Sequence, residues 1–192
     1  MDREQRRLVW ILTIICAVAG GVLALLNGVT EPKIAKQTEE TVKHALHEVL
    51  PAATRFQEDS SMLEEARIGG EEITDFFLGY DQNETPIGMV MIVESRGYSS
   101  TIKLLVGISA EGLVSGVKVL SQSETPGLGN KIVEDSFLLQ PALQDASIRQ
   151  ELAVTKDGGE VQAVTGATVS SRAVVRGINK ALSAARPLLA NL

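Results

Sequence analysis

A short run of small and hydroxyl residues near the C-terminus is the part of this chain best suited to chemistry. Residues 164–171 read Val-Thr-Gly-Ala-Thr-Val-Ser-Ser. Residues 161–164 have the character of the end of a strand, and the residues from Val169 onward have helical spacing. Gly166 marks the tight turn between them, and Ser170 or Ser171 would supply a hydroxyl cap for the helix.

Thr168 therefore lies where the turn enters the predicted helix, beside backbone N–H groups that have no partner within the helix. Such a helix start favours a bound anion, above all a phosphate. A hydroxyl at that position could be a ligand, a nucleophile or an attachment point. The same residue types also make an ordinary turn and a capped helix, because Ser and Thr are common cap residues. The local pattern leaves both interpretations open.

A second segment, residues 123–129, reads Ser-Glu-Thr-Pro-Gly-Leu-Gly and contains a turn signal. Gly129 would let the backbone lie against a flat ligand, Glu124 offers an acceptor, and Leu128 could cover an apolar ring. The residues that this loop offers to a ligand are Glu124, Thr125, Pro126, Gly127, Leu128 and Gly129. Taken alone, the segment is equally an ordinary connection between a strand and a helix.

Both segments resemble parts of the FMN-binding domain family, whose flavin-attachment motif ends in T-G-A-T. Lys156-Asp157-Gly158-Gly159 and Ser171-Arg172-Ala173-Val174-Val175 are similar to the same family. Together with an N-terminal apolar segment, the resemblance covers nearly the whole chain and is strongest to the G subunits of Rnf electron-transport complexes. The family's motif usually begins with Asp three residues before the first Thr or Ser, and here that position is Gln162.

The resemblance implies that Thr168 carries FMN through a phosphoester bond, placed there by a separate flavin transferase that uses FAD. The flavin ring would lie between the loop at residues 124–129 and the turn that holds Thr168. The implied cofactor-binding residues of that turn are Thr165, Gly166, Ala167, Val169 and Ser170. Further candidates are Tyr98, Ser99 and Lys131. Neither a catalytic residue nor a metal ligand is assigned.

The function that the resemblance implies is electron relay in a membrane complex that couples electron transfer between ferredoxin and NAD to translocation of Na⁺ or H⁺. The chain would be a redox subunit of this oxidoreductase, without turnover of its own. Its partners would be the other membrane and redox subunits, and the flavin transferase during maturation.

Two alternatives stay open. One is the C subunit of the sodium-translocating NADH:quinone reductase, which shares the domain, the anchor and covalent FMN but is generally longer. The other is a membrane-anchored assembly module whose T-G-A-T motif carries no flavin, an alternative that Gln162 supports.

Composition excludes several other classes. The 192 residues carry a formal net charge of −6, which argues against nucleic-acid binding. The single cysteine, Cys16, cannot form a disulfide or a Cys-based metal site within one chain. A dinucleotide fingerprint and a P-loop are absent from the sequence. Because the histidines, His44 and His47, lie together in one predicted helix, a Ser-His-Asp or Cys-His site is not predicted.

The N-terminal region predicts a retained membrane anchor. Residues 8–29 carry no charge and are long enough to span a bilayer as a helix. Arginines precede this stretch, so the positive-inside rule places residues 1–7 in the cytoplasm. We therefore expect a single-pass protein of the bacterial cytoplasmic (inner) membrane, with residues 52–192 as an FMN-binding domain on the extracytoplasmic, periplasmic face. Residues 30–51 would form a separate juxtamembrane amphipathic helix, because Pro32 interrupts the chain.

The rest of the chain predicts an α+β domain, in which helices pack against an antiparallel sheet. Alternating apolar residues and polar turns predict two hairpins. Residues 53–72 are polar and mixed, which is typical of a loop with one helical turn. The expected elements are strands at 73–80, 87–94, 102–108 and 113–120, a helix around 132–139, and a short strand at 152–155.

Overall fold

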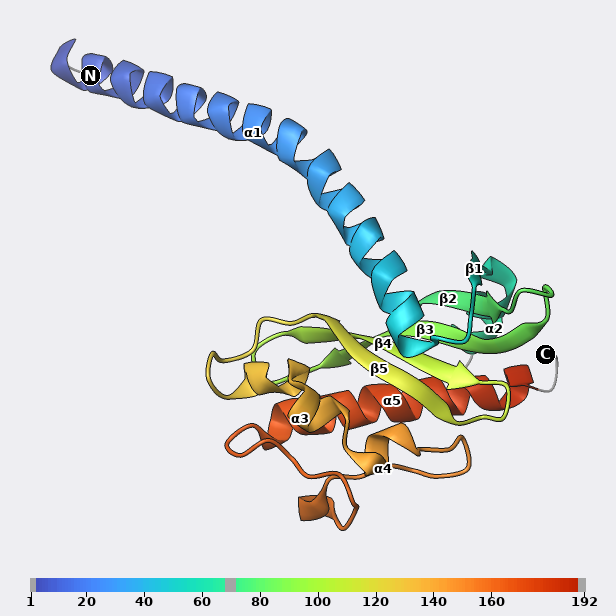
Figure 1. Cartoon of the computed structure of the whole chain (residues 1–192). Helices are drawn as coiled ribbons and strands as arrows, with labels where there is room; N and C mark the ends of the chain where they lie inside the picture. The colour runs from blue at the N-terminus through green and yellow to red at the C-terminus, as the bar shows by residue number, and fades with distance from the viewer. Residues whose placement is uncertain (1–2, 68–71, 190–192) are drawn as a thin grey trace. The chain divides into compact units, whose positions relative to one another are not determined.

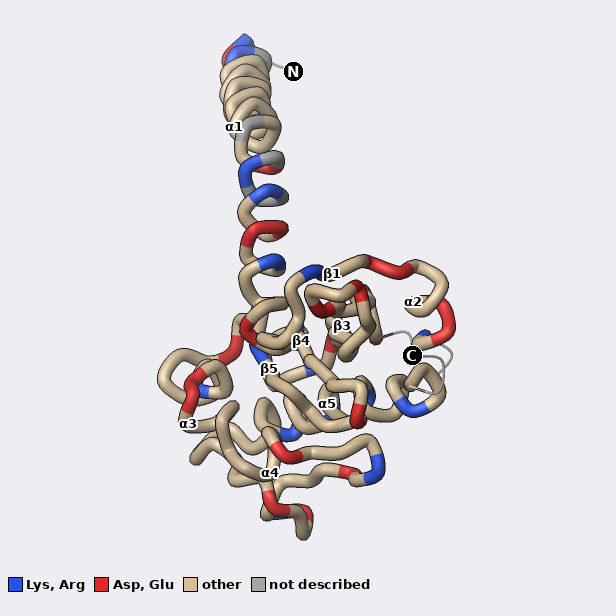
Figure 2. The backbone as a smooth tube through the Cα atoms, turned by 45° about the vertical axis from the view of Figure 1, so that its right-hand side comes forward, with Lys and Arg blue, Asp and Glu red and all other residues tan. Residues whose placement is uncertain are grey.

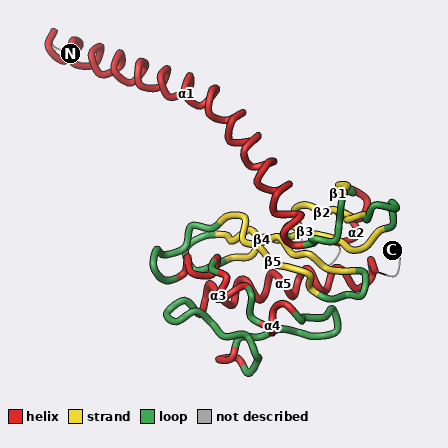
Figure 3. Tube along the Cα trace, in the orientation of Figure 1, coloured by secondary structure: helices red, strands yellow, loops and turns green. Residues whose placement is uncertain are grey.

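The computed structural model describes residues 3–67 and 72–189. Within them, five strands form one antiparallel sheet in sequence order (Figure 3). The strands are β1 (Arg55–Glu58), β2 (Ile73–Tyr80), β3 (Pro86–Arg96), β4 (Thr101–Ser109) and β5 (Val114–Ser121). Both predicted hairpins are confirmed, because β2 pairs with β3 and β4 pairs with β5.

The helices are α1 (Arg3–Val49), α2 (Ser60–Arg67), α3 (Asp135–Leu138), α4 (Pro141–Gln144) and α5 (Thr168–Leu188), with 3₁₀ turns η1 (Gly129–Val133) and η2 (Thr155–Asp157). Figure 1 shows α5 running along one face of the sheet, with α3 and α4 on the same side. The α+β class predicted from the sequence is confirmed.

The long helix α5 provides one half of the main core. Its buried residues Val174, Ile178 and Leu182 recur at helical spacing and pack in one cluster with the inward side chains of β3 and β4. A Cβ at Gly177 would clash with Leu104 Cδ1, so the helix approaches the sheet more closely than a side chain there would allow. The core therefore fixes the position of α5 and of its first residue, Thr168.

The opposite face of the sheet is covered by the end of α1. Ala45, Leu46 and Val49 are buried against Val90 and Leu105 in a second, smaller cluster. The Ser115 hydroxyl donates a 2.6 Å hydrogen bond to the carbonyl oxygen of Val49. The strands β3 and β4 are consequently apolar on both faces, which explains their near-continuous hydrophobic sequence.

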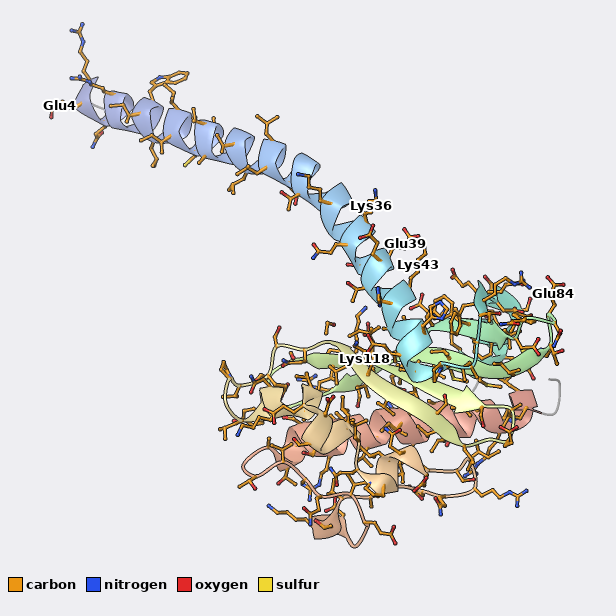
Figure 4. All side chains as sticks on the ribbon, viewed as in Figure 1. Glu4, Lys36, Glu39, Lys43, Glu84 and Lys118 are labelled. Atoms are coloured by element: carbon orange, nitrogen blue, oxygen red, sulfur yellow. The ribbon has the colours of Figure 1, made fainter. Side chains whose placement is uncertain are left out.

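Residues from Val42 onward form one compact unit, which begins earlier than the predicted domain boundary at residue 52. Lys118 on β5 forms an ion pair with Glu48 near the end of α1 (Figure 4 labels Lys118). The last two turns of α1 therefore belong to the folded domain.

The helix α1 runs from Arg3 to Val49 without a break, so the prediction of an interruption at Pro32 was wrong. A proline removes only one backbone donor, and the flanking turns of so long a helix keep their hydrogen bonds. Residues Arg3–Gly28 are long and apolar enough to cross a membrane. Charged residues lie at the start of this stretch and again in the second half of α1 (Figure 2).

Four other segments differ from their predicted structures. Residues 53–72, expected as a loop with one helical turn, contain the helix α2 and also the strand β1, which pairs with β2. The helix expected around 132–139 is divided between η1 and α3, and the chain extends at Glu134 between them. The strands expected at 152–155 and 161–164 are reduced to one parallel bridge, between Val154 and Val161.

Candidate functional site

Thr168 is the first residue of α5, and its side chain is half-buried. The preceding residues 165–167 turn the chain into the helix; we call residues 165–168 the TGAT turn. Gly166 has φ = +79°, a left-handed conformation that glycine adopts without steric cost. The Ala167 amide donates to the Val164 carbonyl at 2.9 Å and closes the turn. The turn predicted at Gly166 is thus confirmed, although the helix begins one residue earlier than expected.

The predicted serine cap of this helix is wrong, because α5 begins at Thr168 after the N-cap residue Ala167, and both serines lie within the helix. Their hydroxyls have other partners. Ser170 Oγ donates to the Glu124 carboxylate at 2.6 Å. Ser171 Oγ donates to the Ala167 carbonyl at 3.0 Å and accepts from the Val164 amide at 3.0 Å.

The start of α5 is consequently open. Among the described residues, no side chain caps the helix, and the amides of Thr168, Val169 and Ser170 have no protein acceptor. Three unpartnered N–H groups at the positive end of a 21-residue helix make a site for an anion. This is the phosphate-compatible geometry that the sequence predicted around Thr168.

A buried carboxylate holds this helix start to two loops. Glu124 is only 5% exposed. It accepts backbone hydrogen bonds from Tyr98 at 3.1 Å, Ser99 at 3.0 Å and Ser100 at 3.0 Å, in addition to the bond from Ser170. Glu124 therefore joins the β3–β4 turn, the loop after β5 and the first turn of α5.

These contacts determine the ionisation of Glu124. Burial alone raises the pKa of this carboxyl, since it disfavours the charged form. The hydrogen bonds from the Ser170 hydroxyl and from the amides of Ser100, Ser99 and Tyr98 favour the carboxylate and outweigh burial. The net result is a pKa below the ordinary glutamic acid value, so Glu124 is negatively charged at neutral pH.

The loop at residues 124–129, which we call the PGLG loop, lies against the TGAT turn. A Cβ at Gly166 would lie 3.0 Å from Leu128 Cδ2, and a Cβ at Gly129 would lie 2.9 Å from Ser170 Oγ. Two segments some forty positions apart in the sequence thus meet. Thr125 stabilises the loop because its carbonyl accepts from the Leu128 and Asn130 amides.

The remaining predicted site residues divide into exposed and buried groups. The exposed members are Thr125, Pro126, Gly127, Leu128, Thr165, Gly166 and Val169. Ala167, Ser170, Glu124 and Gly129 are buried, so their part is to shape the site. Tyr98 is 73% exposed, and it and Ser99 contribute through backbone amides.

A groove of about 700 Å³ borders the TGAT turn at Thr165. Lys131, Phe137 and Val164 contribute to its lining, which gives it both a charged and an apolar part. Gln162 also lines it, and Gln140 braces that position by donating to the Gln162 carbonyl at 3.0 Å and accepting from its amide at 2.7 Å. Grooves of this volume are of the size that holds cofactors.

One residue near Thr168 was missed as a site residue by sequence reasoning. Lys156 Nζ donates to Thr168 Oγ1 at 3.1 Å. The neighbouring Asp157 accepts two hydrogen bonds from Arg172, at 2.7 Å from Nε and 2.5 Å from the terminal nitrogen. Arg172 lowers the pKa of Asp157, first through these hydrogen bonds and then through its charge. The Asp-Gly-Gly turn signal marks this segment, but nothing in the sequence pattern places it beside Thr168.

The two histidines lie away from these groups on the second half of α1. Both are exposed, and the ring of His47 packs edge-on against Phe56 with centroids 4.9 Å apart. In the part of the chain that the structure describes, no three His, Cys, Asp or Glu side chains gather in a metal-binding arrangement.

Comparison with known proteins agrees with this geometry. The model of FMN-binding domains matches residues 97–183, which include the β3–β4 turn, the PGLG loop, the Lys156 segment and the TGAT turn. A model of the RnfG N-terminal region matches residues 1–49. The fold and the site thus define the chain as an FMN-binding domain protein with an N-terminal helix.

Individual relatives identify its family. The chain is 35% identical over 183 residues to the G subunit of the Na⁺-translocating ferredoxin:NAD⁺ oxidoreductase complex of Acetobacterium woodii, covering 90% of this chain and 87% of that protein. It is 32% identical to the G subunit of the ion-translocating oxidoreductase complex of Methanosarcina acetivorans, with 94% of each covered. The chain belongs to the family formed by the G subunits of ion-translocating oxidoreductase complexes.

A solved structure supports the fold. The crystal structure of NqrC from Shewanella oneidensis matches with a TM-score of 0.51 at 19% identity, covering 73% of this chain and 71% of that one.

Proposed function

We propose that this chain is the electron-relay subunit of a membrane complex that couples electron transfer between ferredoxin and NAD to translocation of Na⁺ or H⁺. Its cofactor is FMN, joined to Thr168 by a phosphoester bond. The observation that carries the proposal is the open start of α5, where three amides without an acceptor among the described residues adjoin the Thr168 hydroxyl, to which the Lys156 ammonium donates. This donor set fits a phosphate group.

The surroundings of Thr168 also fit the flat part of a flavin. Gly166 keeps the backbone accessible near the hydroxyl, and Leu128 offers an apolar surface beside it. The groove beside Thr165 supplies the volume. When bound, FMN supplies the redox chemistry, while the protein supplies position and charge. Glu124 holds the two loops in place without contacting the cofactor, since its oxygens already accept bonds from protein donors.

The proposed location follows from α1. Its N-terminal stretch is long and apolar enough to span the bilayer, and basic residues lie at its start. We place the FMN domain on the extracytoplasmic face of the cytoplasmic membrane. A covalent link is advantageous there, because a cofactor lost outside the cell is not readily replaced.

The decisive experiment is the intact mass of the full-length chain after co-expression with a flavin transferase. A mass increase of one FMN less water, with flavin fluorescence on a denaturing gel, is expected for the wild type. The Thr168→Ala variant should show neither. An unmodified wild-type chain beside an active transferase would refute covalent attachment and favour an assembly module without flavin.

A further inference from the structure

The side chain of Lys156 is poised at the proposed attachment residue, and its role rests on the function proposed above. Lys156 Nζ donates to Thr168 Oγ1 at 3.1 Å, and this is its single hydrogen bond within the described part of the chain. We infer that Lys156 is a positioning residue for flavin attachment: it orients the Thr168 hydroxyl for transfer and then neutralises the phosphate charge of the linked FMN.

Two adjacent contacts fix Lys156 in that place. Thr168 and Arg172 are four residues apart on α5 and therefore lie on the same face of the helix. Lys156 contacts the first and Asp157 the second. Because Arg172 is already paired with Asp157, the uncompensated positive charge next to Thr168 is the ammonium group of Lys156.

The backbone around Lys156 is equally well defined. The Gly159 amide donates to the Val154 carbonyl at 3.1 Å, and the Thr155 amide donates to the Val161 carbonyl at 2.9 Å. A Cβ at Gly159 would clash with the Ala153 carbonyl oxygen, so only glycine allows so tight a turn. Residues 155–159, which we call the lysine turn, thus present Lys156 on a constrained backbone.

The chemistry of attachment needs a cation at this point. Thr168 Oγ forms a bond to the phosphorus of the FMN half of FAD, and the bond between that phosphorus and the oxygen of AMP breaks. AMP leaves with the electron pair, and the hydroxyl proton passes to the transferase. No electron is gained or lost by the flavin. The product is a phosphodiester with one negative charge, which the Lys156 ammonium and the open amides of α5 stabilise.

The test measures the initial rate of FMN adduct formation on the full-length chain in detergent, with FAD and purified flavin transferase. We expect Lys156→Met to slow the reaction by about tenfold or more, since one donor to a developing charge is lost. Lys156→Arg should retain much of the rate. Lys103→Met is the matched control, because Lys103 is an exposed lysine on β4 paired with Glu94.

A charge-rescue variant separates this role from a structural one. Lys156→Cys in a Cys16→Ser background leaves one cysteine, and alkylation with bromoethylamine restores an ammonium group of nearly the original length. Recovery of the rate after alkylation is expected. Equal rates for wild type and Lys156→Met, or no recovery on alkylation, would overturn the role of Lys156. A wild-type chain that forms no adduct would instead overturn the proposed function itself.

Discussion

The Glu124 carboxylate accepts a hydrogen bond from the Ser170 hydroxyl at 2.6 Å, and this contact ties the loop after β5 to the first turn of α5. Ser170 lies within the helix, and the N-cap position is Ala167, which has no polar side chain. Among the described residues no side chain caps the amides at the helix start, so they are open to a ligand. The buried pair thus fixes the first turn of α5 without covering these amides.

Replacement of Glu124 by Gln should destabilise the domain by about 2 kcal/mol. The amide nitrogen of Gln would face backbone and hydroxyl donors that now bond to carboxylate oxygens. Thermal or urea unfolding of the full-length chain in detergent measures the change. Ser170→Ala, which removes one donor and keeps the carboxylate, should cost about 1 kcal/mol. Equal stability of Glu124→Gln and wild type would contradict the clamping role of Glu124.

Acid should weaken the domain through the same carboxyl. The pKa of Glu124 in the folded protein lies below its ordinary value of 4.5. Its contribution to stability is therefore fully present above pH 4.5 and is lost as the pH falls through the folded pKa. We expect the difference in Tm between wild type and Glu124→Gln to shrink as the pH decreases from 6 to about 3. A difference that stays constant across this range would rule out the assigned ionisation.

Replacement by alanine should destabilise the domain to different extents at two glycines of the PGLG loop. A Cβ at Gly129 would lie 2.8 Å from Glu124 Cβ and 2.9 Å from Ser170 Oγ, whereas nothing lies within 4 Å of one at Gly127. Gly129→Ala should lower the free energy of unfolding by about 2–3 kcal/mol, because the added methyl group overpacks this site. Gly127→Ala should cost about 1 kcal/mol, because its φ of +75° strains an alanine backbone. Unfolding measurements on both variants test the order, and its reversal would be inconsistent with this packing.

The Asp157–Arg172 pair should matter for flavin attachment more than for stability. Both side chains are largely exposed, so Asp157→Asn should leave Tm nearly unchanged. The lysine turn would be held less firmly, and adduct formation on Thr168 should slow several-fold. Glu94→Gln, which weakens the exposed Lys103 pair on the sheet, provides the control. If Asp157→Asn forms the adduct at the wild-type rate, the pair does not position Lys156.

Gln162 stands where the family's motif usually has Asp, and Gln162→Asp should accelerate flavin attachment. The side chain of Gln162 makes no hydrogen bond to the described residues, since its contacts with Gln140 use backbone atoms. The substitution should therefore leave Tm unchanged while restoring a charge that the transferase can recognise. Gln162→Asn is the neutral comparison. The same rate of adduct formation in all three chains would show that this position does not control transfer.

The sequence predicted the hairpins and α5 well, because their signals are local. Alternating apolar residues specify the strands, and Val174, Ile178 and Leu182 specify the buried face of the helix. The turn at Gly166 could also be predicted from the sequence, since a glycine between two regular patterns marks a change of direction.

The segments between these elements were harder to predict, because tertiary contacts stabilise them. The pairing of Gln140 with the backbone of Gln162 joins residues 22 positions apart and leaves no periodic pattern. The contact of Lys156 with Thr168 likewise depends on a single bridge between Val154 and Val161. The serine cap failed as a prediction because α5 begins at Thr168, which places Ser170 inside the helix, where its hydroxyl donates to a buried carboxylate distant in sequence.

The position of Thr168 at the start of α5 affects what happens to a bonded cofactor when the protein unfolds and refolds. A cofactor bonded there stays with the chain when the domain unfolds, and on refolding it meets its site as part of the same molecule. Its occupancy then depends on an effective local concentration and is independent of free flavin in the surroundings. The helix that completes the hydrophobic core would also carry the cofactor to its binding surface, so folding and cofactor docking become a single event.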